Sequence, residues 1–128
     1  MKDFKYLIFI FFLILTDQIT KFYFFSAGEF ISNTGSLFGF FSGYNTLFVI
    51  ISFIAIGILF YFYEREEDIR LGLSFLIAGT AGNLVDRMMR GYVIDFIDLP
   101  YWPVFNFADL FITIGFGYLV YLYFFDSR

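Results

Sequence analysis

The residues of this chain best suited to chemistry are two aspartates, Asp95 and Asp109, in the segments GYVIDFID (91–98) and FNFAD (105–109). Most of the surrounding sequence is apolar, and an ionisable side chain at or near bilayer depth is costly and usually marks function. Two carboxylates that lie close together can share one proton, so that one acts as an acid while the other acts as a base. The sequence therefore predicts acid–base chemistry at this pair.

The residue types that are missing narrow the chemistry further. With no Cys and no His, the 128-residue chain lacks a thiol nucleophile, a Ser-His or Cys-His catalytic pair and the usual zinc ligands. A magnesium or calcium site made only of carboxylates stays open, but few acids are placed for one, and we expect neither metal nor cofactor. The net charge of −4 argues against nucleic-acid binding, which needs a basic face.

Several other polar residues could support the two aspartates. Asp17 and Lys21 are four residues apart, so on a helix they share a face and can form either a simple ion pair or an anchor for substrate. The run from Asn33 to Gly35 is typical of a turn, although an Asn amide can also bind an extended peptide backbone.

A second polar group follows the segment AGTAGNLVDR (78–87). Gly79, Asn83 and Arg87 recur every four residues and so lie on one helix face, and Asp86 can pair with Arg90 one turn later. Snorkelling at a helix end would account for Arg90 but not for Asn83, because an amide near the membrane needs a partner. Further along the chain, Asn106 lies one turn before Asp109.

The elements that position these residues are apolar helices. The composition is 60% hydrophobic and 27% aromatic, in blocks of about the 20 residues that a membrane helix needs. We expect an all-α membrane protein of one domain (1–128), with spans at about 4–25, 44–63, 71–90 and 105–125 and loops at 26–43 and 91–104. The first span is expected to stay uncleaved, and small residues at Ala78, Gly79, Ala81 and Gly82 should let helices approach closely in the third.

Four spans place both termini on one side of the membrane. If that side is the cytoplasm, it carries five basic residues (Lys2, Lys5, Arg65, Arg70 and Arg128) against three outside (Lys21, Arg87 and Arg90). This balance agrees with the positive-inside rule. Both loops, and the unusual polar residues with them, would then face the outside.

Local pattern also assigns roles to the two aspartates. Residues 92–98 alternate well enough for a strand, with Asp95 between the apolar Val93 and Ile97 on one face, while Asp109 lies in the first turn of a helix, where the dipole favours an anion. We therefore expect Asp95 to begin protonated and polarise a scissile carbonyl, and Asp109 to act as the base toward water. This is the chemistry of an aspartyl intramembrane protease.

The chain resembles the bacterial lipoprotein signal peptidases (signal peptidase II). The likeness rests on DQITK (17–21), NTGSLFG (33–39), AGTAGNLVDRMMRGYVIDFID (78–98) and FNFADLFITIG (105–115), in this order and spacing. It implies four membrane helices with a small extracytoplasmic β-cradle in the bacterial inner membrane, and cleavage of prolipoproteins before a diacylglyceryl-modified Cys. It also implies membrane lipid as a partner and inhibition by globomycin-type cyclic peptides.

The resemblance assigns residues as well. The catalytic pair falls on Asp95 and Asp109, and substrate-binding positions fall on Asp17, Lys21, Asn33, Gly35, Gly79, Asn83, Arg87, Val93, Phe105, Asn106 and Ala108. Two alternatives remain open. One is a Ser/Lys protease, in which Lys21 activates Ser32, Ser36 or Ser42. The other is a small proton- or ion-coupled membrane protein that uses buried carboxylates as relays, although the acids here gather at one membrane face.

Overall fold

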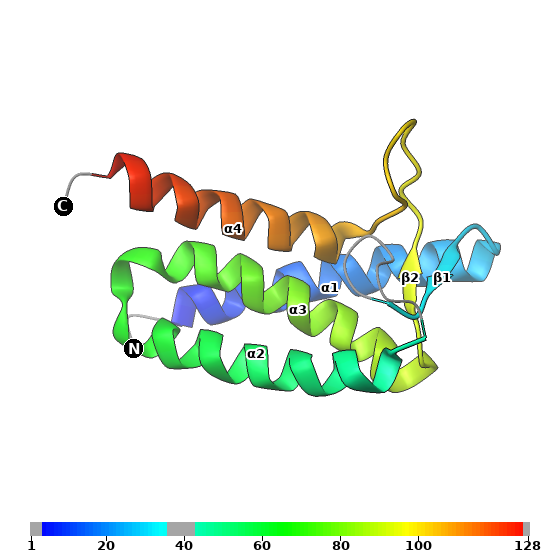
Figure 1. Ribbon diagram of the computed structural model, residues 1–128, viewed down its shortest axis with the longest axis horizontal. Coiled ribbons are helices and arrows are strands. Elements are labelled where there is room, and N and C mark those ends of the chain that lie inside the picture. Colours follow the sequence, from blue (N-terminus) through cyan, green and yellow to red (C-terminus); the bar gives the residue numbers. More distant parts are fainter. Residues whose placement is uncertain (1–3, 36–42, 127–128) are drawn as a thin grey trace.

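The computed structural model describes residues 4–35 and 43–126. In chain order its elements are α1 (Phe4–Ala27), β1 (Ile31–Asn33), α2 (Asn45–Arg65), the single-turn helix η2 (Glu67–Ile69), α3 (Arg70–Arg90), β2 (Val93–Asp95) and α4 (Phe107–Phe125). Each long helix begins and ends within two residues of a predicted span. The helices lie roughly along one axis, with β1 and β2 at one end and the start of α1 and the end of α4 at the other (Figure 1).

Three of the long helices have the length and apolar character needed to cross a membrane: α1, α2 and α4. Their surfaces expose many large apolar side chains, such as Phe11, Phe53 and Phe116, which lipid can cover. α3 has 21 residues but is more polar, since Arg70, Asn83, Asp86 and Arg87 all lie buried along it. The membrane span predicted at 71–90 is therefore a helix of sufficient length, and its crossing of the bilayer stays a prediction.

The helix α3 can carry buried polar residues because the other three long helices all pack against it. Small residues allow this packing: a Cβ added at Gly79 would overlap the carbonyl oxygen of Ala108, and one at Gly115 would lie 2.7 Å from the carbonyl oxygen of Gly72. The predicted close approach at the small residues of α3 is thus confirmed. Protein, and not lipid, surrounds most of the polar groups of α3.

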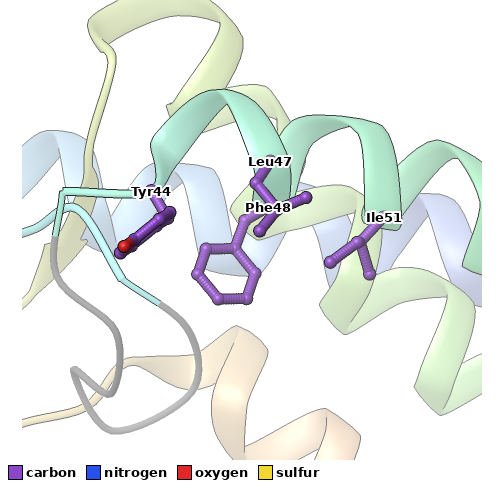
Figure 2. Close-up of a pocket in the computed structure, with 4 residues that line it drawn as sticks. All are labelled: Tyr44, Leu47, Phe48 and Ile51. Carbon is purple, nitrogen blue, oxygen red and sulfur yellow. The ribbon is translucent and has the colours of Figure 1, made fainter.

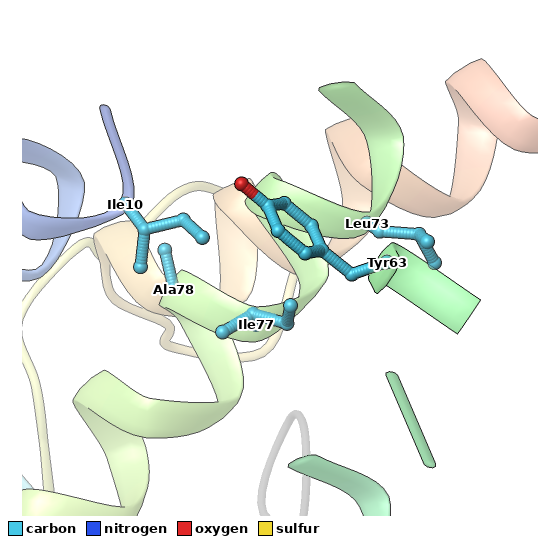
Figure 3. Packing of buried hydrophobic residues seen from close by; sticks show 5 residues of the cluster. All are labelled: Ile10, Tyr63, Leu73, Ile77 and Ala78. Atoms are coloured by element: carbon cyan, nitrogen blue, oxygen red, sulfur yellow. The ribbon is translucent and has the colours of Figure 1, made fainter. Parts of the chain in front are cut away.

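The apolar core lies where α1 and α2 meet α3. Ile10, Tyr63, Leu73, Ile77 and Ala78 are all less than 8% exposed and form one cluster (Figure 3). Nearer the end with the strands, aromatic rings continue this packing. Phe24 of α1 stacks on Phe96 with ring centroids 4.3 Å apart. This contact holds the end of β2 against α1.

The strands form an antiparallel pair in which Ile31 lies opposite Asp95 and Asn33 lies opposite Val93. All three residues of β2 are buried, because both α1 and α3 contact this strand. The side chains that alternate along β2 therefore face protein on both sides of the strand. Beyond β2, Ile97 and Phe105 form a bridge in which the Ile97 N–H donates to the Phe105 oxygen at 2.8 Å. The segment predicted as loop 91–104 therefore contains a strand and a hairpin.

Local signals at the helix ends place the two aspartates. Gly91 ends α3 in the left-handed region at φ +80°, which Gly adopts at little cost, and the chain turns there into β2. Asn106 caps α4: its side chain accepts the Asp109 N–H, and the Asp109 side chain accepts the Asn106 N–H. This capping box is the reason why Asp109 lies in the first turn of the helix, as predicted.

Candidate active site

Asp95 ends β2 in a buried position, with 3% of its surface exposed. Its two carboxylate oxygens accept hydrogen bonds from different elements: Oδ2 from the Asn33 side-chain amide at 3.0 Å and Oδ1 from the Asn106 side-chain amide at 2.9 Å. Burial, followed by the nearby charge of Asp109, raises the pKa of Asp95 from 3.8 to about 7, although the hydrogen bonds from Asn33 and Asn106 and the charge of Lys21 act to lower it. Asp95 is thus suited to hold a proton near neutral pH.

Asp109 is 2% exposed, and both of its carboxylate oxygens accept hydrogen bonds. Its Oδ1 accepts the Asn83 side-chain amide at 3.1 Å and its Oδ2 accepts the Asn106 N–H at 3.2 Å. The N-terminus of α4 adds the favourable end of a helix dipole. The two aspartates therefore occupy different settings, Asp95 at the end of a buried strand and Asp109 at the N-terminus of a helix.

Two amides connect the pair. The Asn106 side-chain Nδ2 donates to Asp95 Oδ1, to the Ile94 oxygen at 3.2 Å and to Asn83 Oδ1 at 3.0 Å. Asn83, in turn, donates to Asp109. Asn83 and Asn106, which the sequence singled out, thus lie between the two carboxylates and hold them in one network.

Asp17 and Lys21 form the predicted ion pair, with Lys21 Nζ 2.7 Å from Asp17 Oδ2. Both are almost completely buried, at 0% and 1% exposed. Lys21 also lies 3.1 Å from Asp86 Oδ2 and donates to Asn83 Oδ1 at 3.1 Å. Asp17 and Lys21 therefore lie in the protein interior, and Lys21 contacts Asn83, which donates to Asp109.

Arg87 is buried and faces β1 and α2. Its Nη2 donates to the Gly35 oxygen at 2.6 Å, and its guanidinium lies 5.5 Å from the centre of the Phe48 ring. Its Nε has no hydrogen-bond partner among the described residues. Gly35 N–H donates to Asn33 Oδ1 at 2.8 Å, so the predicted turn at residues 33–35 is formed by a side-chain acceptor.

The remaining predicted positions fall into two groups. Gly79, Val93 and Ala108 are at packing contacts: Gly79 lies against α4 at Ala108, and Val93 and Ala108 are 1% and 0% exposed. Phe105 instead lines a cavity. This apolar pocket, of about 370 Å³, is lined by Leu99, Trp102, Phe105, Asp109, Leu110 and Thr113.

A second apolar pocket, of about 280 Å³, lies at the start of α2 and is lined by Tyr44, Leu47, Phe48 and Ile51. Figure 2 shows these four side chains on one side of the first turns of α2. Because Arg87 lies over Phe48, this pocket adjoins the Arg87 side of the site.

The sequence analysis did not identify two residues, Asp86 and Gln18, as part of the site. Asp86 was expected to pair only with Arg90, and that contact exists at 3.9 Å, but Asp86 also contacts Lys21 and accepts the Ile94 N–H. Gln18 donates to both Asp17 and Asp86. No local signal could have found the contacts of Asp86 with Lys21 and Gln18, because these partners are far apart in the chain.

The structure gives little support to a Ser/Lys pair. Lys21 Nζ is enclosed by two carboxylates and the Asn83 amide oxygen, whereas Ser32 is exposed on β1. Ser36 and Ser42 lie outside the described residues. Within 4–35 and 43–126 there is also no group of three or more acidic residues that could hold a metal ion.

Two buried aspartates that are joined through the amides of Asn83 and Asn106, beside an apolar pocket and at one end of a bundle of mostly apolar helices, are the arrangement expected of a membrane-embedded aspartic peptidase. The chain belongs to the signal peptidase II family: the model described as signal peptidase (SPase) II matches residues 9–125. It is thus an aspartic endopeptidase that removes signal peptides from prolipoproteins. This membership favours peptide cleavage over the alternative of a proton- or ion-coupled protein.

Individual relatives support this assignment. The lipoprotein signal peptidase of Thermodesulfovibrio yellowstonii is 39% identical over 140 residues, which cover 94% of this chain and 95% of that protein. That of Staphylococcus carnosus is 38% identical over 104 residues, 75% of this chain and 65% of the relative. A solved structure described as a bacterial membrane enzyme has a TM-score of 0.84 and 30% identity, and the match covers 93% of this chain and 86% of the other.

Proposed function

We propose that Asp95 and Asp109 are the catalytic dyad of this peptidase. The observation that carries the proposal is the placement of Asn106, which hydrogen-bonds to both carboxylates beside an apolar pocket. An aspartic peptidase needs one protonated and one ionised carboxyl group, and the two settings differ in that direction.

The proposed reaction proceeds without a covalent intermediate. Asp109 takes a proton from water, the resulting hydroxide adds to the scissile carbonyl carbon, and Asp95 gives its proton to the carbonyl oxygen. When the tetrahedral intermediate collapses, Asp109 passes its proton to the leaving amine and the hydroxyl proton returns to Asp95. Because water is the nucleophile, each turnover consumes one water and restores the dyad.

Groups around the dyad would hold the substrate backbone. Arg87 is the best placed for this task, because its buried Nε is a hydrogen-bond donor that has no partner among the described residues. Arg87 donates to the oxygen of Gly35, and Gly35 donates its N–H to Asn33 at the end of β1. A substrate strand placed along β1 could therefore receive hydrogen bonds from both sides.

The substrate we propose is a prolipoprotein cut before a diacylglyceryl-modified Cys. The pocket of about 370 Å³ beside Asp109 is apolar, and we assign it to the lipid-bearing residue. Burial of acyl chains contributes about 0.8 kcal/mol per CH₂. A globomycin-type cyclic peptide would occupy the same pocket and so compete with the substrate.

In the membrane, we propose four spans with both termini in the cytoplasm of a bacterium and the dyad near the outer face of the inner membrane. The ends of α1 and α4 that lie opposite the strands would then face the cytoplasm (Figure 1). α3 would cross inside the ring of the other helices, where its polar residues are shielded from lipid. Reporter fusions at the C-terminus and in the 98–103 hairpin would test this arrangement.

The direct test is cleavage of a diacylglyceryl-modified prolipoprotein by the purified wild type, Asp95→Asn and Asp109→Asn. Asp98→Asn is the matched control, because Asp98 is an exposed acid three residues from Asp95. We expect both dyad variants to be folded and inactive and the control to be active. Near-full activity of either dyad variant would show that the two aspartates are not a catalytic pair.

A further inference from the structure

A buried charged cluster of Asp17, Lys21 and Asp86 lies next to the dyad and is used by no step of the proposed reaction. All three side chains are at most 1% exposed. Three buried charges are costly unless they are paired and hydrogen-bonded, so their contacts indicate what the cluster does.

Each carboxylate of the cluster holds the residue that comes directly before one of the catalytic aspartates. Asp17 Oδ1 accepts the N–H of Ala108 at 2.9 Å, and Ala108 precedes Asp109. Asp86 Oδ2 accepts the N–H of Ile94 at 3.1 Å, and Ile94 precedes Asp95. The start of α4 and the strand β2 are thus each attached to the cluster through a backbone amide.

Two side chains of α1 join the two attachments. Lys21 Nζ lies 2.7 Å from Asp17 Oδ2 and 3.1 Å from Asp86 Oδ2. The Gln18 amide donates to Asp17 Oδ2 at 3.2 Å and to Asp86 Oδ1 at 3.1 Å. Fully satisfied buried networks of this kind are rigid, because any displacement leaves a buried charge without a partner.

We propose that Asp17 and Asp86, joined by Lys21, are positioning residues that set the separation of the two catalytic carboxylates. This inference rests on the proposed dyad. It differs from the substrate-binding role expected for Asp17 and Lys21, because the cluster has almost no accessible surface. It adds Asp86 to the residues that the reaction needs, since a misplacement of about 1 Å can lower a rate on the order of 10²-fold.

The test compares Asp86→Ala and Asp86→Asn with Ile77→Ala. Ile77 belongs to the apolar core cluster with Ile10 and Tyr63, and its truncation should also lower the melting temperature. We expect both Asp86 variants to lose kcat, on the order of 10²-fold for Asp86→Ala, with KM within about twofold of the wild type. The Ile77→Ala control should lose as much melting temperature as the Asp86 variants. At a temperature where it is folded, it should nevertheless keep the kcat of the wild type.

Hydrogen exchange supplies a second readout that a general loss of stability would not reproduce. In the wild type the amides of Ile94 and Ala108 should be protected, and fast exchange of either would overturn the inference even if no Asp86 variant folds. In Asp86→Ala the Ile94 amide should exchange faster while the Ala108 amide stays protected. The Asp17→Ala variant should show the opposite pattern.

The outcome for the dyad is separable from the outcome for the cluster. If Asp95→Asn is active, the proposed dyad itself fails. If Asp95→Asn is inactive while folded Asp86→Ala and Asp86→Asn keep the kcat of the wild type, the dyad stands and only the positioning role is wrong.

Discussion

Asn106 donates its side-chain amide to Asp95 Oδ1 at 2.9 Å, although it belongs to the cap of α4 and Asp95 belongs to β2. The same residue accepts the Asp109 N–H at 2.9 Å and donates its own N–H to Asp109 at 3.2 Å. The residue that starts the helix is therefore also the residue that orients both carboxylates, and the two tasks can be separated by substitution.

Replacing Asn106 should separate helix capping from catalysis. Asn106→Ala removes the cap and the bridge, so we expect a stability loss of about 1 kcal/mol and a fall in kcat of at least about 10²-fold. Asn106→Ser keeps a capping hydroxyl but is too short to bridge to Asp95. It should regain most of the melting temperature and little of the kcat. Equal recovery of both quantities in the Ser variant would contradict the bridging role.

The pH dependence should follow Asp95. Burial, followed by the charge of Asp109, raises the pKa of this residue to about 7, and the proposed mechanism needs it protonated. We therefore expect kcat to fall as the pH rises through about 7, measured with substrate in a fixed detergent. A kcat that stays constant between about pH 6 and about pH 8 would contradict the assignment of the proton to Asp95.

The titration of Asp95 should also lower the stability of the folded protein as the pH rises. Its pKa is about 7 in the folded protein against 3.8 as the ordinary value, so the folded state holds the proton over this interval while the unfolded state has released it. The free energy of unfolding should therefore decrease as the pH rises from about 4 to about 7. Asp95→Asn removes this titration, and the slope of melting temperature against pH in that interval should be smaller in the variant.

Gly79 should be needed for packing. A Cβ at this position would overlap the Ala108 oxygen and lie 2.6 Å from Ile112 Cγ1, so Gly79→Ala should push α4 away from α3 and cost about 1–3 kcal/mol. Gly117→Ala on α4 is the control, because nothing lies within 4 Å of a Cβ there. Thermal unfolding in detergent measures both, and equal melting temperatures would show that the contact at Gly79 relaxes without cost.

The pocket beside Asp109 should control the use of the lipid-bearing substrate. Leu110→Trp places a larger ring in the pocket of about 370 Å³, and we expect KM to rise by about tenfold with a smaller change in kcat. Val120→Trp lies on the exposed face of α4 and serves as the control. Measurements with short and long acyl chains should show a larger effect for long chains, and an unchanged KM for both would exclude the pocket as the lipid site.

Much of this protein follows from short-range pattern. The helices α1, α2 and α4 follow from apolar runs of the length that spans a bilayer, and the end of α3 at Gly91 follows from the ease with which Gly adopts a positive φ. The ion pair of Asp17 with Lys21 and the capping box of Asn106 with Asp109 also join residues within four positions of each other. The geometry of one helical turn determines such contacts, so the sequence predicts the ion pair and places Asn106 one turn before Asp109.

Other features needed the tertiary structure. The sequence indicates that Asp86 can reach Arg90, but its contacts with Lys21 and with the Ile94 N–H depend on how α1, α3 and β2 pack. β2 is buried on both faces for the same reason, since a strand's own alternation does not report what covers it.

By itself the sequence predicted the long helices, the family and Asp95 with Asp109 as the candidate pair, because helix length and motif spacing are properties of the chain. Only the tertiary structure decided that Asn106 lies between the carboxylates and that Asp17, Lys21 and Asp86 hold the residues before them. These contacts join groups up to 91 positions apart, and no local rule relates such groups until the helices pack.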